Sequence, residues 1–153
     1  MNNNKKNCIA IVVGIGLVMF SCTDRNSTRG IIADNPTEVI VKLFDCWNEK
    51  SDCINLCSKS INKSKISHSA AVVSNAKGSY VITDNGHSIY QKLNGKTPKL
   101  NSNQMIYRII SSGGKAGPFH TNLGEKFEGY VIVEQHTGTN RYYIADISIK
   151  DSK

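Results

Sequence analysis

The apolar positions after residue 35 recur at helical spacing; they are Val39, Ile40, Leu43, Phe44 and Trp47. Just before them, Asn35 can cap a helix and Pro36 suits its first position. Glu38 lies three residues after the cap, as in a capping box. We therefore predict an amphipathic helix from Pro36 to about Glu49.

The next part of the chain is less regular. A polar step at residues 48–52 breaks the helical pattern, and its last residues can cap a second, short helix over residues 53–59. Residues 55–69 are polar and give no clear period. The run over residues 69–77 predicts a third helix that ends at Gly78, with a strand as the alternative.

Beyond residue 79 the apolar spacing changes to two, which predicts strands. Two short runs, residues 80–83 and 88–91, flank Asn85-Gly86, and this dipeptide is the strongest short hairpin signal. Later strands are expected at residues 104–111, 127–136 and 141–150, the last two joined as a hairpin. Helices followed by strands predict an α+β fold, with helices on one face of a curved antiparallel sheet of about four to six strands.

The first 22 residues have the layout of a secretory leader. Two lysines, at positions 5 and 6, precede an apolar stretch of 13 residues, Cys8 to Phe20, which ends in Ser21-Cys22. A helix that spans the hydrocarbon core of a bilayer needs about 20 residues. A cleaved leader therefore fits better than a permanent membrane span.

Met19-Phe20-Ser21-Cys22 resembles the lipobox of bacterial lipoproteins. The resemblance implies a signal peptide at residues 1–21, lipidation of Cys22 with chains such as palmitate, and firm attachment to a membrane. In this family an aspartate after the cysteine retains the protein on the inner membrane. Thr23 takes that position here, which implies the outer membrane, facing the periplasm or the cell surface. The alternative is an ordinary signal peptide that leaves Cys22 as a free thiol.

Residues 22–34 are polar and predict a tether between the lipid and a single α+β domain at residues 35–153. Loss of the leader leaves a formal charge of about +5, because it removes Lys5 and Lys6 and no acid. The basic residues are dispersed and form no nucleic-acid footprint. We therefore expect as partners a membrane and a small ligand or envelope protein, and no nucleic acid.

Three cysteines remain in the predicted domain: Cys46, Cys53 and Cys57. In an oxidising compartment, one disulfide and one buried thiol are the simple outcome. Cys46 can pair with Cys53 or with Cys57 across the polar step. Three thiols without a nearby histidine are a poor zinc site. We expect no metal and no cofactor.

The best candidates for chemistry lie on the last hairpin. Glu134 and His136 point to one face of their strand, and Arg141 begins the partner strand. A carboxylate, an imidazole and a guanidinium could serve as general acid, general base and anion clamp. The competing interpretation, which we favour, is that polar residues belong at a hairpin end and pair across strands.

The start of the predicted domain, Asn35-Pro36-Thr37-Glu38 and then Trp47-Asn48-Glu49-Lys50-Ser51-Asp52-Cys53, resembles small NTF2-like, or cystatin-like, lipoproteins. In that family a Pro-capped helix ends in a polar step whose aspartate opens a second helix, and a curved antiparallel sheet follows. The resemblance implies a pocket in the curled sheet. Its lining residues here would be Tyr107, Tyr130, Ile132 and Tyr143.

Many members of that family bind ligands and some are enzymes, but no catalytic motif of the family matches this chain. We therefore expect a lipid-anchored cell-envelope protein that is not an enzyme and binds a small ligand or an envelope partner. One alternative is a small secreted hydrolase or ribonuclease-like enzyme that uses Glu134, His136 and Arg141. Another is an immunity or inhibitor lipoprotein.

Overall fold

A computed structural model of the chain describes residues 8–13, 17–22, 29–75, 80–111 and 126–152, with side chains for 29–74, 80–111 and 126–152. Its elements are β1 (Cys8–Val13), β2 (Leu17–Cys22), β3 (Ile31–Ile32), α1 (Thr37–Asn48), the 3₁₀ turn η1 (Ile54–Leu56), α2 (Lys63–Asn75), β4 (Tyr80–Thr83), α3 (Gly86–Asn94), β5 (Gln104–Ser111), β6 (Phe127–Gln135) and β7 (Arg141–Asp151). Strands β1 and β2 form a two-stranded antiparallel sheet of their own.

Much of the predicted leader, and the side chain of Cys22, lie outside the described residues. The signal peptide and the lipidation therefore stay predictions. Among the helices of the described part, none has the length and apolar character needed to cross a bilayer.

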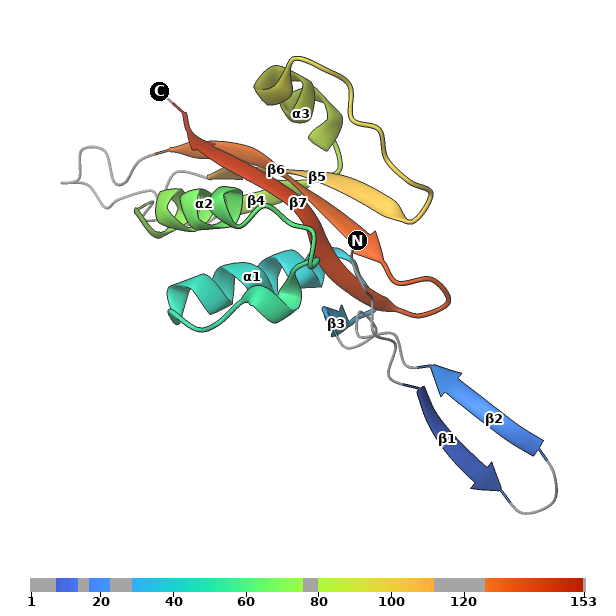
Figure 1. Ribbon diagram of the computed structural model, residues 1–153. Coiled ribbons are helices and arrows are strands. Elements are labelled where there is room, and N and C mark those ends of the chain that lie inside the picture. The colour runs from blue at the N-terminus through green and yellow to red at the C-terminus, as the bar shows by residue number, and fades with distance from the viewer. Residues whose placement is uncertain (1–7, 14–16, 23–28, 76–79, 112–125, 153) are drawn as a thin grey trace.

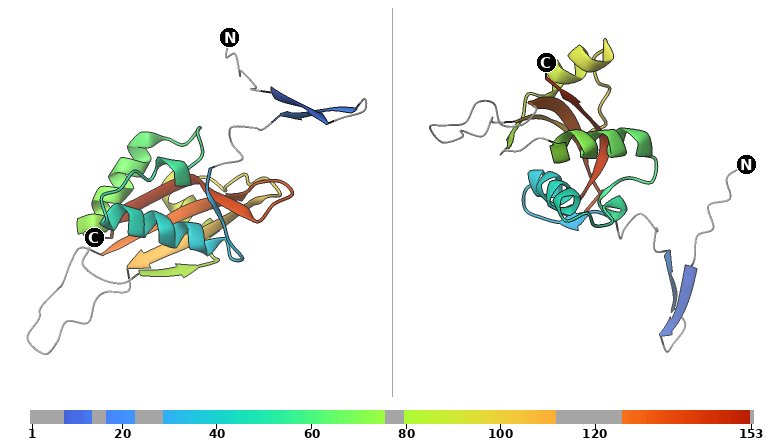
Figure 2. Two further views of the ribbon diagram at one scale, coloured as in Figure 1. Left: turned by 90° about the horizontal axis from the view of Figure 1, so that it is seen from below. Right: turned by 90° about the vertical axis from the view of Figure 1, so that its left-hand side faces the viewer.

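The domain is built on a curled five-stranded sheet with the order β3-β7-β6-β5-β4, in which all neighbours are antiparallel. Helices α1 and α2 cover one face and α3 lies on the other (Figures 1 and 2). The predicted α+β class and the number of strands are confirmed. The helices do not all share one face, however, because α3 packs on the opposite face. The sequence analysis did not predict this helix.

The first core lies between the sheet and the helices α1 and α2. The five apolar residues that predicted α1 are all buried in it, with exposed fractions of 8% or less. Phe44 stacks on Trp47, with ring centroids 5.2 Å apart, and meets the edge of Tyr80 at 4.6 Å. This aromatic group joins the end of α1 to the edge strand β4.

The predicted capping residues lie at the start of α1, but the helix begins at Thr37 and its N-cap is Pro36, one residue later than predicted. The side-chain oxygen of Asn35 accepts a hydrogen bond from the backbone N–H of Thr37 at 2.9 Å. In return, Glu38 accepts one from the backbone N–H of Asn35 at 3.4 Å. These reciprocal bonds satisfy two N–H groups at the start of the helix, as a capping box does.

Helix α2 covers the open edge of β7. The prediction of a helix over residues 69–77 is right in kind, but α2 begins at Lys63, because the side chain of Asn62 accepts hydrogen bonds from the backbone N–H groups of Ser64 and Lys65. A buried serine, Ser69, accepts the backbone N–H of Ile149 at 3.1 Å. An edge strand left open would invite pairing with another chain, and α2 prevents this along β7.

The hairpin predicted around Asn85-Gly86 is wrong. Only β4 forms, and residues 88–91 belong to the helix α3. Gly86 is the first residue of α3, and a Cβ there would lie 2.7 Å from the Ile106 side chain, so the residue serves close packing and not a hairpin turn. The helix ends at Gly95 in the left-handed conformation, with φ of 68°. Ile89 and Leu93, one helical turn apart, contribute to a second core with Ile106, Tyr130 and Ile132.

The folded domain begins earlier than predicted. Part of the expected tether, residues 29–34, lies against the sheet, since β3 pairs with the start of β7. Ala33 is buried and donates its backbone N–H to the Asn140 carbonyl at 3.0 Å. The polar composition of residues 23–34 hides these few apolar residues, so the boundary could not be seen in the sequence.

The three long strands lie where the sequence predicts them. The bounds of β5 agree, and those of β6 and β7 differ by one residue each at their C-terminal ends. The register between β6 and β7 shifts at Ile132/Val133, where β7 accommodates Ala145 as an extra residue. Such a bulge increases the local twist and helps the sheet to curl.

Candidate functional site

The three candidate catalytic residues lie at the end of the β6–β7 hairpin. Glu134 is on β6, His136 follows β6, and Arg141 begins β7. The backbone N–H of His136 donates to the Arg141 carbonyl at 2.8 Å, which brings the backbones of these two residues together. Position alone therefore agrees with the grouping that the sequence predicts.

Their side chains, however, bind to other residues. Glu134 accepts hydrogen bonds from the Tyr143 hydroxyl and from the Gln104 amide nitrogen, the latter at 2.6 Å. The Arg141 guanidinium donates to the Gly30 carbonyl at 3.2 Å. The His136 ring nitrogen Nδ1 lies 3.3 Å from the carbonyl of the next residue. Among the described side chains, no hydrogen bond joins any two of the three candidates.

The contact between Tyr143 and Glu134 is that of a phenol donor and a carboxylate acceptor. Burial, and then the neighbouring Glu134 carboxylate, raise the pKa of Tyr143 above its ordinary value. The phenol thus keeps its proton, and the contact links two strands. Such a contact is structural: it gives no group that is poised to exchange a proton near neutral pH.

A second polar cluster, formed by Lys65, Tyr130 and Asp146, was missed by the sequence reasoning. The hydroxyl of Tyr130 donates to Asp146 at 2.9 Å, and the Lys65 ammonium donates to both Asp146 oxygens at 3.0 Å and to the Tyr130 hydroxyl at 3.3 Å. Burial lowers the pKa of Lys65, but the hydrogen bond to Asp146 and its charge outweigh this, so the net shift is upward. These bonds tie α2 to β6 and β7. Lys65 is 81 residues from Asp146 in the chain, and no local pattern joins them.

Another polar group joins α3 to the sheet. Glu128 pairs with Lys92 of α3 and with Arg108 of β5, the latter at 3.2 Å. The hydrogen bond from Lys92, and then that from Arg108, hold the pKa of Glu128 below its ordinary value against the effect of burial. Glu128 is thereby ionised and both its oxygens have cationic partners. This group is also structural.

The pocket predicted in the curled sheet does not form from its four expected residues. Tyr107 faces the first core, under α1 and α2. Tyr130 and Ile132 face the second core, which α3 fills with Ile89 and Leu93. The four residues could not line one pocket, because alternate residues of a strand point to opposite faces and Tyr107 falls on the other one.

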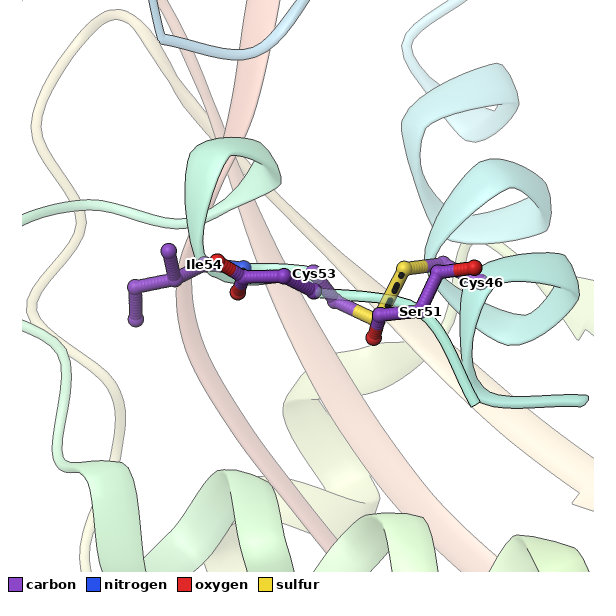
Figure 3. The surroundings of a disulfide bond; sticks show 5 residues. Cys46, Ser51, Cys53 and Ile54 are labelled. Atoms are coloured by element: carbon purple, nitrogen blue, oxygen red, sulfur yellow. Dashed lines mark hydrogen bonds between the residues drawn. A yellow bond between two sulfur atoms is a disulfide. The ribbon is translucent and has the colours of Figure 1, made fainter. Parts of the chain in front are cut away.

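The polar step after α1 forms a disulfide loop. Of the two pairings left open by the sequence, the structure has Cys46 joined to Cys53, with their Cα atoms 5.9 Å apart (Figure 3). Cys57 is a free buried thiol. Asp52 accepts the backbone N–H of Ile54 at 3.0 Å, but the N-cap of η1 is Cys53, which makes no side-chain cap bond. The cap of the second helix therefore lies one residue after the polar step that was predicted to supply it. That helix is only a 3₁₀ turn of three residues.

A groove of about 290 Å³ lies between this loop and α2. Its lining has an apolar part, formed by Trp47, Cys53, Ile54, Cys57, Ile66 and Ala70, and a polar part, formed by Ser51, Asp52, Lys63 and Ser67. Burial raises the pKa of the Cys57 thiol to about 11, although the Arg29 charge opposes the shift. A thiol that stays protonated is a poor nucleophile, so the groove fits binding better than thiol chemistry.

Comparisons of the chain with protein-family models, with curated proteins and with solved structures found no match. Within the described residues, no group of three His, Cys, Asp or Glu side chains could hold a metal ion together. Assignment of a function therefore rests on the leader, the groove and the surfaces around it.

Proposed function

We propose that this chain is a lipid-anchored protein of the bacterial cell envelope, and that it binds the apolar part of a small ligand or envelope partner in the groove between α1, the disulfide loop and α2. It acts by binding and not by catalysis. The anchor is the lipidated Cys22, and the outer membrane is its location. The observation that carries the proposal is the groove, where the half-buried side chains of Ile54 and Ile66 lie with the largely buried Trp47 beside a covalently fixed loop.

The make-up of the groove supports binding. Ligand sites are concave, mostly apolar, and carry a few polar groups that orient the ligand. Here Ile66 and Ala70 of α2 lie across from Trp47, and Asp52 and Lys63 supply one charge of each sign. Each Å² of apolar surface that a ligand covers there contributes about 25 cal/mol.

The hydrogen bonds of the hairpin candidates argue against the hydrolase alternative. A general base must reach the proton that it removes. Glu134 already accepts from Tyr143 and Gln104, and Arg141 donates to the backbone of Gly30. A substrate would have to displace these contacts before any of the groups could act.

The anchor is tested by metabolic labelling of cells that express the full chain with an alkyne-bearing palmitate analogue. We expect label on the wild-type chain and none on Cys22→Ser. Cys8→Ser is the matched control, because it removes a cysteine of the leader and should keep the label. Equal labelling of Cys22→Ser and wild type would reject lipidation at this residue.

The groove is tested with 6-bromohexanol, a small apolar alcohol whose bromine quenches tryptophan fluorescence on contact. Trp47 is the only tryptophan of the chain, so the signal reports on the groove alone. We expect quenching that saturates for the wild type and becomes linear for Ala70→Phe, which fills the groove. Val41→Phe adds the same ring at an exposed position of α1 and should keep the saturation. Linear quenching in all three would refute the groove as a binding site.

A further inference from the structure

We propose that a small hollow lined by Arg29, Ser58, Lys59 and Tyr143 binds a phosphate group. The hollow measures about 20 Å³ and lies on the other side of the η1 segment from the groove, since Cys57 lines the groove and the next residue lines the hollow. A space of this size holds one compact polar group, about one water molecule in extent. It therefore admits one oxygen of a phosphate group, whose other oxygens stay outside the hollow, and it excludes a whole organic ligand.

The guanidinium of Arg29 is fixed in place by the protein. Its Nη1 donates to the carbonyls of Ile54 at 3.2 Å and Cys57 at 2.8 Å. Both bonds use the same nitrogen, and Nη2 and Nε make no hydrogen bond with a described residue. A planar guanidinium whose other two nitrogens have no partner among the described residues matches the oxygens of a phosphate, which it can bind with two parallel bonds.

The hollow has an excess of positive charge. Lys59 brings a second cation from the segment after η1. The ion pairs of the described residues involve Lys65, Lys92 and Arg108, so neither Arg29 nor Lys59 has a carboxylate partner among those residues. An anion would neutralise this pair of cations at close range.

The two neutral residues complete the hollow. The backbone N–H of Ser58 donates to the Ile144 carbonyl at 2.8 Å and fixes the residue beside β7. Its hydroxyl exchanges a hydrogen bond with that of Ser60 at 2.8 Å, and it can turn to an oxyanion in its place. The hydroxyl of Tyr143 already donates a hydrogen bond to Glu134. Tyr143 therefore lines the hollow with its aromatic ring and offers no donor to an anion. Recognition thus falls to Arg29, Lys59 and Ser58.

The phosphate could belong to a phospholipid headgroup or to a soluble phosphate compound. This choice of source rests on the proposed anchor. Arg29 follows Cys22 by seven residues, and a fully extended chain of that length spans about 25 Å. Lipidation of Cys22 would therefore hold the hollow within reach of the headgroups.

Calorimetric titration of the full chain, purified from membranes in a neutral maltoside detergent, tests the site. The probes are inorganic phosphate and dihexanoyl phosphatidylglycerol below its micellar concentration. Saturable binding of the lipid alone identifies a headgroup site, and equal binding of both identifies a site for phosphate as such; either supports the proposal. Binding of neither probe overturns it.

Charge-matched variants show whether the hollow is responsible. Lys59→Gln should weaken binding about tenfold or more, since hydrogen bonds to charged groups are strong. Lys96→Gln removes the same charge at an exposed position and should bind as the wild type does. Arg29→Lys keeps the charge but loses the planar fork, so we expect weakened binding from it as well, with an unchanged melting temperature as evidence of folding.

Equal affinities of the wild type and the three variants for the probes would reject the hollow as the binding site. That result would leave the labelling of Cys22 and the quenching of Trp47 untouched, so the two proposals can fail separately.

Discussion

The hydroxyl of Ser69 accepts the backbone N–H of Ile149 at 3.1 Å, and Ser69 is fully buried. This bond joins α2 to the one edge of the sheet that the short strand β3 leaves largely open. A serine in the middle of a helix usually points to solvent or bonds to its own helix. Here it replaces a missing neighbouring strand.

Ser69→Ala should therefore destabilise the fold by about 1–3 kcal/mol, because the N–H of Ile149 is left buried without an acceptor. Urea unfolding of the full chain, followed by the fluorescence of Trp47, measures the loss. Ser67→Ala, an exposed serine of the same helix, is the control and should change stability by roughly 0.5 kcal/mol or less. Equal stabilities of the two variants would contradict the role given to Ser69.

Cys57 should make the fold less stable in alkali. Its thiol has a folded pKa of about 11, raised by burial from the ordinary value of 9.0. The folded state therefore holds the proton that the unfolded state releases, and stability falls as the pH rises from the unfolded value toward the folded one. The loss is about 1.4 kcal/mol per pH unit within that window.

Cys57→Ala should lose less stability between those two pH values than the wild type does. The comparison concerns the slope with pH, because the small cavity that alanine leaves lowers stability at every pH. Urea unfolding at a series of pH values gives both slopes. Parallel slopes would mean that the pKa of the Cys57 thiol is the same in the folded and unfolded states, so that burial does not raise it.

The sequence was most informative where the spacing of apolar residues, or a capping residue, favours only one local structure. The five apolar residues of α1, its capping pair Asn35 and Glu38, and the strands β5, β6 and β7 follow directly from period and capping. The hairpin at Asn85-Gly86 failed because the dipeptide fits either a turn or the start of a helix. The helical spacing of Ile89 and Leu93, together with Gly95, is the signal that could have decided it.

The candidate sites depend on contacts between distant parts of the chain. The hollow joins Arg29, from the expected tether, to Tyr143 near the C-terminus. The groove needs Trp47 of α1 and Ile66 of α2 to lie across from each other. Spacing along a sequence reports on one helix or strand at a time, so neither arrangement could be predicted before the elements were packed together.

Tyr130→Phe should destabilise the protein by about 1–3 kcal/mol, because Asp146 then loses a buried donor. The nearby Tyr90, whose ring centroid lies 4.7 Å from that of Tyr130, is the control. Its hydroxyl makes no hydrogen bond with a described residue, so Tyr90→Phe should be close to neutral. Urea unfolding of both variants at neutral pH separates the loss of this hydrogen bond from a change of aromatic packing.

The double variant Glu134→Gln/His136→Ala should leave ligand binding unchanged. Neither residue lines the groove, and the hydrogen bonds of Glu134 to Tyr143 and Gln104 serve the sheet. The expected result is a saturable quenching curve for Trp47 that overlaps the wild-type curve, together with a loss of stability of about 1 kcal/mol from the weakened contacts. If the variant unfolded cooperatively but its quenching curve no longer saturated, Glu134 and His136 would have to be part of the binding site.

The disulfide between Cys46 and Cys53 should control both stability and the shape of the groove. The two residues are seven apart in the chain, and a closed loop of this length contributes about 2.5 kcal/mol in the chain-entropy model. The double variant Cys46→Ala/Cys53→Ala should therefore unfold at a lower urea concentration. It should also bind 6-bromohexanol more weakly, because Trp47 lies within the released loop and Ile54 directly follows it. Cys57→Ala keeps the disulfide and is the control for loss of a cysteine at the groove. If the quenching curve of the double variant matched that of the wild type, the disulfide loop would not be needed for the shape of the groove.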